Sequence, residues 1–536
     1  MKVADTLAAT LKAYGAEWAF GIPGNDVLET VRACEEAGIG FVLGKSEPSC
    51  AFMADAVFQL TGKPSVLIPA LGPGISNAMS GIAGAMQERS AIAVLCGEMA
   101  TKQMGVYNHQ VFDHVALARP VTKYADNLNP KRAGQQLAKA LDIALSYPAG
   151  PVFLNVPSDY NREEAANEEP RGPAQRAITA LAEPSATRLR EVLAKAKRPI
   201  ALAGRGALIG QTPQAFKKFV EGWKLPFFTT YKAKGLTGDQ HPLCLGSVGL
   251  SPVVDTENLA LIKEADCIVL VGFDPIELRD AWLDAWPHSL PVVSIDWTAL
   301  NHRIFPVGEE ALGDVPTLLG QLLPSATVAS SWTAERFKSL RTKVAHIVRP
   351  RKPEKGISPA ALFAAVSGQA KDDWIMTVDV GAHRILANHV LQCRVPGQLM
   401  QSNGLGCMGY AVPAAIAAQL VHPERPVVAM LGDGCMLMTQ GELALAAERN
   451  LPLVVVVLND DALALIKLKQ SKMNMSPRAT DFKSPDFAKI AEGFGARGVR
   501  VDTIEAFNKA LAEAVASRRF TLIDAQVDPS EYWEQM

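Results

Sequence analysis

Short apolar runs alternate with longer stretches of helical periodicity along most of the chain. Runs such as 91–96 and 453–458 are bounded by Gly, Pro or Asn, and helix-like segments with apolar residues on one face separate them. This alternation is typical of βαβ units, in which parallel strands are joined by crossover helices. The pattern therefore predicts an α/β protein built from doubly wound parallel sheets.

Two segments interrupt the alternation. Residues 161–188 are rich in Glu, Ala, Pro and Arg, and residues 323–359 run through Ser and Thr into the basic stretch 349–355. We interpret both as linkers. The basic stretch lacks aromatic partners, which favours a solvated connector over a nucleic-acid patch. Three domains are then predicted, at 1–163, 185–325 and 357–536, the central one being Rossmann-like.

A weak internal repeat relates the first and third domains. Residues 64–74 and 426–434 each form an apolar run that ends in a Gly-x-Gly turn, and each leads through a helical stretch to another strand-like run. This similarity suggests a duplicated domain. Two ordinary βαβ units would explain the pattern almost as well, so the repeat by itself assigns no function.

Composition narrows the class of protein. The 536 residues include 53 Lys and Arg and 55 Asp and Glu, a formal net charge of −2, which argues against a polycation that binds nucleic acid. No apolar run approaches the ~20 residues of a membrane-spanning helix. The first residues lack the layout of a secretory signal, so a cytoplasmic location is expected. The cysteines include no Cys-x-x-Cys pair and fit neither a disulfide framework nor a structural zinc site.

The clearest chemical signal lies where two successive predicted strands end. One ends in Gly432-Asp433-Gly434, and the next ends in Asn459-Asp460. A right-handed crossover points both carboxyl ends to the same side of the sheet, so Asp433 and Asp460 are expected to converge. Paired carboxylates on a crevice rim suit Mg²⁺, and the glycines let a backbone approach phosphate oxygens. A lone Gly-Asp-Gly is commonly only a turn, and the matched residue on the next strand makes this pattern specific.

These strand ends resemble the Mg²⁺–thiamine diphosphate motif of the thiamine diphosphate-dependent decarboxylase/acetohydroxyacid synthase superfamily. The resemblance is closest to the flavin-free, catabolic acetolactate synthases. It implies that Asp433, Asp460 and the backbone carbonyl of Ala462 bind the metal, with Asn459 as the alternative to Asp460. It also implies that the N-terminal domain binds the cofactor's pyrimidine ring and the C-terminal domain binds its diphosphate.

Thiamine chemistry further requires a carboxyl group hydrogen-bonded to the cofactor's pyrimidine ring. Glu47 ends the strand-like run 40–47 and is followed by Ala-containing helical residues. Taken alone, this segment favours a helix N-terminal carboxylate. The family's spacing of Glu and Ala matches residues 47–56, and the resemblance implies that Glu47 is the catalytic acid.

Two further segments resemble cofactor-binding stretches of the family. Residues 401–413 match a Gly-rich segment that grips the pyrimidine, although a Met in such a turn is otherwise most often core filler. Residues 381–383 lie where relatives contact the diphosphate. The resemblance thus implies a cofactor site formed by Gly381, Ala382, His383, Gly406, Met408, Gly432, Asp433, Gly434, Cys435 and Asp460.

The substrate is less well specified. Several motifs resemble acetolactate synthases, which decarboxylate pyruvate and join the product to a second pyruvate. The resemblance implies that Gln110 lies near the reacting carbons and that Gly24, Ile466 and Lys469 belong to the substrate pocket. His109 is a candidate proton relay, or acts indirectly through residues that touch the substrate. Lys469 is either a solvated helix residue or a cation that holds an anionic acceptor. Ser46 and 70–71 depart from the usual family residues, which leaves a simple 2-oxo-acid decarboxylase or a sulfoacetaldehyde-type acetyltransferase open.

Two interpretations of other classes remain. Residues 202–210 form a weak dinucleotide fingerprint, which favours a flavin or nicotinamide oxidoreductase. No acidic ribose ligand is evident about 20 residues further on, and 272–277 resembles the flavin-free branch, so FAD is expected to be absent. A non-catalytic paralogue is disfavoured because Glu47, Asp433 and Asp460 are all retained. The resemblance also implies a homodimer or homotetramer, with no nucleic-acid or membrane partner.

Overall fold

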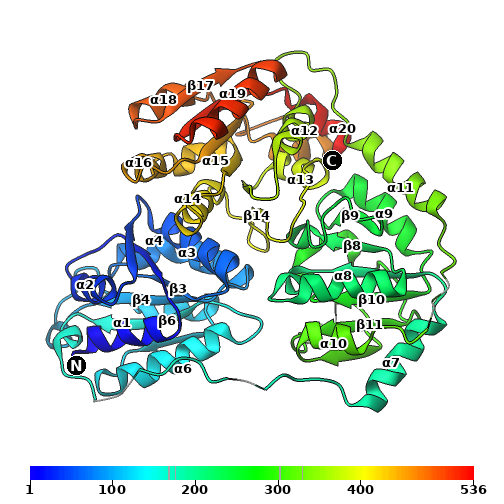
Figure 1. Cartoon of the computed structure of the whole chain (residues 1–536). Helices are drawn as coiled ribbons and strands as arrows, with labels where there is room; N and C mark the ends of the chain where they lie inside the picture. The colour runs from blue at the N-terminus through cyan, green and yellow to red at the C-terminus, as the bar shows by residue number, and fades with distance from the viewer. Residues whose placement is uncertain (167–169, 176, 301–303, 327, 329) are drawn as a thin grey trace.

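Three separate six-stranded sheets make up the chain. The computed structural model describes residues 1–166, 170–175, 177–300, 304–326, 328 and 330–536. All pairings between the named strands are parallel, and helices cover both faces of each sheet. Figure 1 shows the resulting lobes, coloured blue, green and yellow to red along the chain. The predicted doubly wound α/β fold is confirmed.

The N-terminal sheet has the strand order β2-β1-β3-β4-β6-β5. Its central strands β4 and β6 are buried at every position, because helices lie on both faces. The strands are β1 (Trp18–Gly21), β2 (Gly40–Leu43), β3 (Ser65–Leu67), β4 (Ile92–Glu98), β5 (Tyr124–Asn127) and β6 (Val152–Pro157). The helices are α1 (Val3–Ala13), α2 (Leu28–Glu36), α3 (Glu47–Thr61), α4 (Pro73–Gln87), α5 (His114–Ala118) and α6 (Ala133–Leu145).

The central sheet has the order β12-β11-β10-β7-β8-β9, which is the dinucleotide-binding order when its strands are counted from β7. The strands are β7 (Pro199–Ala203), β8 (Phe227–Thr230), β9 (Cys244–Val248), β10 (Cys267–Val271), β11 (Val292–Asp296) and β12 (Glu309–Leu312). The helices are α7 (Glu183–Lys195), α8 (Thr212–Trp223), α9 (Pro252–Ile262) and α10 (Val315–Gln321).

The C-terminal sheet has the order β14-β13-β15-β16-β18-β17. Its strands are β13 (Ile375–Val378), β14 (Leu399–Gln401), β15 (Val427–Gly432), β16 (Val454–Asn459), β17 (Arg497–Val501) and β18 (Thr521–Gln526). Its helices are α12 (Pro359–Gln369), α13 (Ala382–Val390), α14 (Ala411–Val421), α15 (Asp433–Thr439), α16 (Glu442–Glu448), α17 (Ala464–Lys472), α18 (Phe487–Gly493), α19 (Ile504–Ser517) and α20 (Tyr532–Gln535).

The N- and C-terminal domains share one topology. Counted within each domain, both sheets follow the order second, first, third, fourth, sixth, fifth. The two segments of the sequence repeat occupy equivalent places, at β3–β4 and at β15–β16. The repeat therefore reflects matching architecture, which the central domain does not share.

The interpretation of 323–359 as a plain linker is wrong in part, because this segment contains the helix α11 (Ala334–Ile347). The side chain of Thr333 caps the helix by accepting a hydrogen bond from the backbone N–H of Arg336. Leu340 is fully buried, and Phe337 and Val344 pack beside it against the central domain. This 3–4 spacing of apolar residues was the missed helical signal. Of the other linker, residues 167–169 and 176 lie outside the described residues.

Hydrophobic packing joins the N- and C-terminal domains. Helices α3 and α14 lie side by side, and one continuous apolar core contains residues of both. Phe52 and Tyr410 meet edge to face across this boundary, with ring centroids 5.7 Å apart. Among the described residues, no helix combines the length and the apolar character that a membrane crossing requires.

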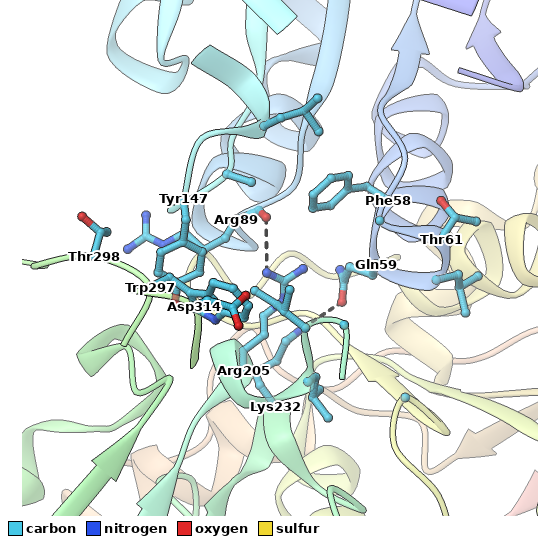
Figure 2. Close-up of a pocket in the computed structure, with 18 of the residues that line it drawn as sticks. Phe58, Gln59, Thr61, Arg89, Tyr147, Arg205, Lys232, Trp297, Thr298 and Asp314 are labelled. Carbon is cyan, nitrogen blue, oxygen red and sulfur yellow. Dashed lines mark hydrogen bonds between the residues drawn. The ribbon is translucent and has the colours of Figure 1, made fainter. Parts of the chain in front are cut away.

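A cavity of about 790 Å³ lies between the N-terminal and central domains (Figure 2). It opens at the carboxyl ends of β7 and β11, and aromatic residues such as Tyr147 and Trp297 line it together with Arg89 and Arg205. Arg205 donates a hydrogen bond to the backbone carbonyl of Arg89 at 3.2 Å. Lys232 forms part of the cavity wall and connects it to a buried polar network.

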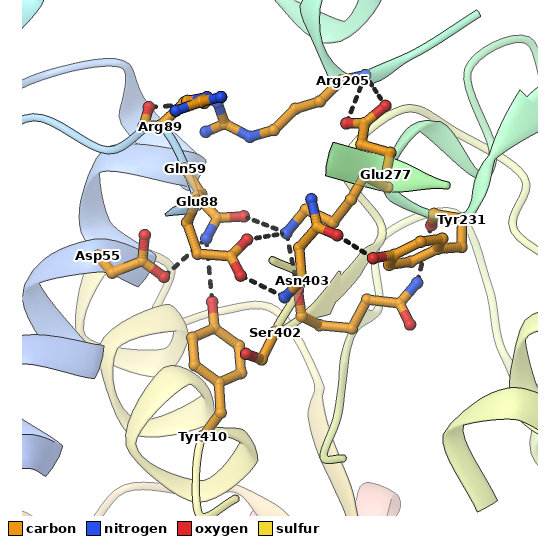
Figure 3. A network of polar contacts seen from close by, with 12 residues as sticks. Asp55, Gln59, Glu88, Arg89, Arg205, Tyr231, Glu277, Ser402, Asn403 and Tyr410 are labelled. Atoms are coloured by element: carbon orange, nitrogen blue, oxygen red, sulfur yellow. Dashed lines mark hydrogen bonds and ion pairs between the residues drawn. The ribbon is translucent and has the colours of Figure 1, made fainter. Parts of the chain in front are cut away.

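This network contains residues of all three domains, among them Glu88, Tyr231 and Asn403 (Figure 3), and Lys232 connects them. The buried ammonium group of Lys232, in the central domain, donates to Glu88 Oε2 at 2.6 Å and to Gln59 Oε1 at 3.2 Å, both in the N-terminal domain. It also donates to the backbone carbonyl of Gln401, in the C-terminal domain, at 2.7 Å. Removing one member of such a buried ion pair typically costs about 3–5 kcal/mol, so this contact holds the domains in one arrangement.

Asp55 makes the stability of this junction depend on pH. It is buried on α3, where burial and then the charge of Glu88 raise its pKa from 3.8 to about 6. Between about pH 4 and pH 6 the folded chain keeps a proton that the unfolded chain has released, so stability falls as pH rises through this window. In Asp55→Asn this loss, on the order of 2 kcal/mol, should disappear.

Urea unfolding of both proteins at pH 4.5, 5.5 and 6.5 measures the difference. Asp372→Asn, which changes an exposed carboxylate, serves as the matched control and should follow the wild-type curve. Parallel pH profiles for wild type and Asp55→Asn would contradict this prediction.

Candidate active site

A cavity of about 120 Å³ lies at the carboxyl ends of β13, β15 and β16. It sits beside the point where the strand order of the C-terminal sheet reverses, which is the usual ligand position in such sheets. Of the residues expected from the sequence to form the site, it is lined by Gly381, Ala382, His383, Met408, Gly432, Asp433, Gly434, Cys435, Asp460, Ala462 and Ile466.

Asp433 and Asp460 face this cavity from neighbouring strand ends. Asp433 is buried, and its Oδ2 accepts hydrogen bonds from the backbone N–H of Asp461 at 2.8 Å and from the hydroxyl of Ser484 at 2.9 Å. Burial raises the pKa of the Asp433 carboxyl. For Asp460, burial and then the negative charge of Asp433 raise the pKa well above its usual range.

This pair of carboxylates suits a cation. Lys467, the positive charge that acts on Asp460, forms an ion pair with Asp481 at 2.6 Å. Two like charges in a desolvated space repel each other, and a bound divalent ion would reverse that penalty. In the described ranges no cluster of three or more His, Cys, Asp or Glu side chains could hold a metal. Two carboxylates do not fill the coordination sphere of a divalent ion, which also takes oxygens from the backbone, from water or from a phosphate.

Asn459 points away from the cavity. Its side-chain Nδ2 donates to Asp524 Oδ1 on β18 at 3.0 Å, and the residue is buried. Successive residues of a strand point to opposite faces, so Asn459 and Asp460 face different sides of the sheet end. Of the two candidates for the second carboxylate or amide ligand, Asp460 is the one that lines the cavity.

Glycines keep the cavity open. A Cβ on Gly432 would lie 3.2 Å from Cε1 of His383, and a Cβ on Gly434 would lie 3.0 Å from Cδ2 of Leu463 and 3.4 Å from Cε of Met408. The bare backbone can therefore approach a ligand closely. Burial lowers the pKa of His383 to about 3, so its ring is neutral. Its buried Nε2 has no hydrogen-bond partner and is available to a ligand.

The turn that carries Met408 is fixed by Asp379, which sequence reasoning did not identify. This buried residue follows β13, and its carboxylate accepts hydrogen bonds from the backbone N–H groups of Gly409 at 3.0 Å and Ala411 at 2.9 Å. A polar residue directly after a buried strand was the available signal. Gly406, two residues before Met408, does not line the cavity, although it adopts a left-handed φ of 66° that favours glycine.

Four of the predicted residues lie on the N-terminal domain. Glu47 begins α3, and its Oε2 accepts a hydrogen bond from Asn77 Nδ2 at 2.5 Å. Gly24 follows β1, and His109 and Gln110 are exposed in the segment after β4. None of these four residues lines the cavity that contains Asp433. Within one chain, Glu47 and the cavity with Asp433 thus lie apart, each near the carboxyl ends of strands in its own sheet.

Ile466 lies at the open side of the cavity with 44 % of its surface exposed, whereas Lys469 is exposed on the next turn of α17 and is not part of the lining. Tyr532 of α20 also faces the cavity. Tyr532 lies far from the motifs in the sequence, so nothing in the sequence indicated that it would line the cavity. The other lining residues that sequence reasoning did not identify are Val380, Leu458, Leu463, Ala464 and Leu465.

The backbone N–H groups of the dinucleotide fingerprint in the central domain already donate hydrogen bonds within the protein. The backbone N–H of Arg205 donates to both carboxylate oxygens of Glu277, at 3.0 and 3.2 Å. The N–H of Gly204 donates to the carbonyl of Val271, and that of Gly206 to the carbonyl of Gly272. A bound diphosphate depends on such N–H groups, so this turn does not offer it a cradle.

Three protein-family models match the chain. They are described as thiamine pyrophosphate enzyme, N-terminal TPP binding domain (residues 1–117), central domain (186–322) and C-terminal TPP binding domain (379–525). The last of these contains the cavity with Asp433 and Asp460.

Similar curated proteins align along nearly their full length. One is the acetolactate synthase of Bacillus subtilis (strain 168), 28% identical, with 98% of this chain and 93% of the relative covered. Another is the acetolactate synthase isozyme 3 large subunit of Escherichia coli (strain K12), 28% identical, with 99% and 95% covered. A third is the probable 2-ketoarginine decarboxylase AruI of Pseudomonas aeruginosa, 29% identical, with 97% and 93% covered.

The order of the three matched domains agrees with the three sheets, and the cavity at the end of β15 and β16 lies in the matched C-terminal TPP binding domain. The chain therefore belongs to the thiamine pyrophosphate enzymes, and it is similar to acetolactate synthases along nearly its whole length.

Proposed function

We propose that this chain is a thiamine diphosphate-dependent enzyme that decarboxylates a 2-oxo acid, with pyruvate as the proposed donor, and joins the product to a second carbonyl compound. The observation that carries the proposal is the cavity where the carboxylates of Asp433 and Asp460 converge beside the bare backbone of Gly432 and Gly434. This arrangement fits a Mg²⁺-bound diphosphate within a TPP binding domain.

In the proposed site, Asp433, Asp460 and the backbone carbonyl of Ala462 hold Mg²⁺ through hard oxygen ligands. Gly381 and Ala382, at the start of α13, offer backbone N–H groups to the diphosphate. The unpartnered Nε2 of His383 supplies one further polar contact. Met408 supports the cofactor from below, Cys435 forms part of the cavity wall, and Gly406 shapes the turn that leads to Met408.

When bound, thiamine diphosphate supplies the electron sink for loss of CO₂ from a 2-oxo acid. Glu47 holds and exchanges a proton at the pyrimidine ring, and its hydrogen bond from Asn77 orients the carboxyl group. His109 and Gln110 lie near the reacting carbons in this proposal. Gly24, Ile466 and Lys469 form the substrate pocket, with the charge of Lys469 directed at the carboxylate of an anionic acceptor.

We further propose that a second copy of the chain completes each site, so that a homodimer is the minimal active unit and a tetramer is compatible with it. The separation of Glu47 from the cavity of its own chain supports this arrangement. The segment after β4, which contains His109 and Gln110, exposes apolar side chains that a partner subunit would bury, among them Val106, Tyr107 and Phe112. The cytoplasmic location remains a prediction.

A simple 2-oxo-acid decarboxylase is the second candidate, favoured by the similarity to AruI, which carries a decarboxylase name. A sulfoacetaldehyde-type acetyltransferase would use the same site with another donor. An oxidoreductase is disfavoured, because Glu277 occupies the N–H group that a dinucleotide would need. A non-catalytic paralogue is disfavoured by the retained Glu47, Asp433 and Asp460.

Product analysis separates these functions. The purified protein, loaded with thiamine diphosphate and Mg²⁺, is incubated with pyruvate, and the products are identified by NMR. We expect acetolactate. Acetaldehyde alone would support the decarboxylase, and turnover of a different 2-oxo acid alone would exclude pyruvate as the donor. No turnover of any 2-oxo acid by cofactor-loaded protein would contradict the proposed function.

The choice of metal ligand can be tested with a neighbouring pair of variants. Asp460→Ala should weaken Mg²⁺-dependent binding of thiamine diphosphate by about 100-fold or more, because a direct charged ligand is lost. Asn459→Ala breaks only the hydrogen bond to Asp524, so it should lower stability and leave cofactor affinity within a few-fold. Isothermal titration calorimetry measures both affinities. The reverse ranking would identify Asn459 as the ligand.

Glu47→Gln should lower kcat by about 10²–10⁴-fold, since a neutral amide cannot exchange the proton, while cofactor affinity stays nearly unchanged. Mixing this variant with Asp433→Ala tests the shared site. Each is inactive alone, but a hybrid dimer carries one intact site, so random exchange should restore about one quarter of wild-type activity. Absence of any recovery after verified subunit exchange would place Glu47 and Asp433 in the same chain's site.

A further inference from the structure

We propose that Lys232 of the central domain is a positioning residue for the cofactor. It acts through residues 401–408, which we call the cofactor loop, and the chain of contacts from Lys232 to this loop carries the proposal. The inference rests on the proposed function only in that the cofactor is taken to lie against Met408. The contacts within the protein do not depend on it.

Lys232 holds the first residue of the cofactor loop directly. It lies in the short helix η6 (Tyr231–Ala233) after β8, where its buried Nζ donates to the carbonyl oxygen of Gln401 at 2.7 Å. The side chain of Gln401 returns a hydrogen bond from its Nε2 to the carbonyl of Tyr231, also at 2.7 Å. The central domain thus holds Gln401 through both its backbone and its side chain.

The next two residues of the loop are held by the same network. The backbone N–H of Asn403 donates to Glu88, the ion-pair partner of Lys232, and the hydroxyl of Tyr231 donates to the side-chain oxygen of Asn403. Arg384 donates to the carbonyl of Ser402. Arg384 directly follows His383 of the cofactor cavity, so the network supports both the loop and the first turn of α13.

The rest of the loop is confined between domains. A Cβ on Gly404 would lie 2.4 Å from Cδ1 of Ile276 in the central domain and 2.9 Å from Cβ of Gln87 in the N-terminal domain. The thiol of Cys407 lies 3.6 Å from the carbonyl of Ser80 on α4. Met408 then enters the cavity.

Both ends of the loop are therefore fixed, by the Lys232 network at 401–403 and by Asp379 just after Met408. Releasing the first end gives the loop alternative arrangements. A ligand that binds only one arrangement loses apparent affinity in proportion to the population of that arrangement. At saturating cofactor the chemistry itself is unchanged, so apparent KM for thiamine diphosphate rises while kcat is retained.

Replacing Lys232 alone leaves Glu88 as a buried carboxylate beside Asp55, which destabilises the fold for a separate reason. The informative variant is therefore the double replacement Lys232→Met with Glu88→Gln, which removes both charges. Lys232→Arg keeps the charge and serves as the conservative variant that should recover part of the affinity.

Lys234→Met is the matched control. Lys234 lies two residues away and is equally buried, and its ion pair with Asp239 at 2.6 Å also links the central domain to the C-terminal domain, because Asp239 accepts a hydrogen bond from the N–H of Cys393. The ion pair that the structure describes for Lys234 involves Asp239 and no residue of 401–408. A general loss of stability should affect this variant in the same way as the double replacement.

The test combines two measurements on the full-length protein. Hydrogen–deuterium exchange of residues 399–410, with and without thiamine diphosphate and Mg²⁺, reports release of the loop, and titration with thiamine diphosphate gives its apparent KM and kcat. For the double replacement we expect loop exchange and apparent KM each to rise about tenfold or more, with kcat within about twofold of wild type. Lys234→Met should change neither.

Unchanged exchange in the double variant, or an equal rise of apparent KM in Lys234→Met, would overturn the proposal. A fall in kcat without a change in apparent KM would also overturn it, since the loop would then act on the chemistry. If wild-type protein binds no thiamine diphosphate, the proposed function fails, and exchange in cofactor-free protein still decides whether Lys232 fixes the loop.

Discussion

Two carboxylates held close together at neighbouring strand ends are the constraint around which this molecule is arranged. Asp433 and Asp460 face one small cavity; burial raises the pKa of both carboxyl groups, and the charge of Asp433 raises that of Asp460 further. Such a pair is unfavourable unless a cation joins it. The bare glycines, the unpartnered nitrogen of His383 and the turn fixed by Asp379 before α14 all surround this point.

The geometry of parallel sheets explains how distant residues reach one site. Every strand of a doubly wound sheet presents its carboxyl end at the same edge, so residues that follow different strands gather without being close in sequence. The N- and C-terminal sheets share their strand order, and each carries candidate site residues at that edge. In the proposed function, the N-terminal sheet supplies Glu47 as a proton carrier, and the C-terminal sheet supplies Asp433 and Asp460 for metal and phosphate. The shared strand order suggests duplication of one domain.

The central domain has another topology and another role. Its dinucleotide-type turn is closed by Glu277, while Lys232 on the adjacent strand end extends into the contact with both outer domains. Lys232 and Glu88 are buried in this junction, and the hydrogen-bond partners of Lys232 come from the two outer domains. Moving the domains apart would leave the buried charges of Lys232 and Glu88 without partners, so the junction fixes the orientation of the domains in addition to the apolar packing.

The sequence by itself determined the architecture and the centre of the site. The periodicity of apolar residues identified parallel α/β domains, and the right-handed crossover rule brought Asp433 and Asp460 together from residues 27 positions apart. These features are local or follow from a strong rule of chirality. The spacing of apolar residues in α11 also indicates a helix, but the many polar residues around them favoured the interpretation as a linker.

Only the tertiary structure decided which neighbour of a pair faces the cavity, which distant segments close it and where the domains are joined. Asn459 and Asp460 are neighbours at a strand end that bends into a turn, and their side chains point to opposite sides. The alternation of residues in the sequence does not say which of the two faces the cavity. Tyr532 and Lys232 reach their positions through packing between elements far apart in the chain. Long-range contacts of this kind leave no periodic trace in the sequence, because they depend on how whole domains meet.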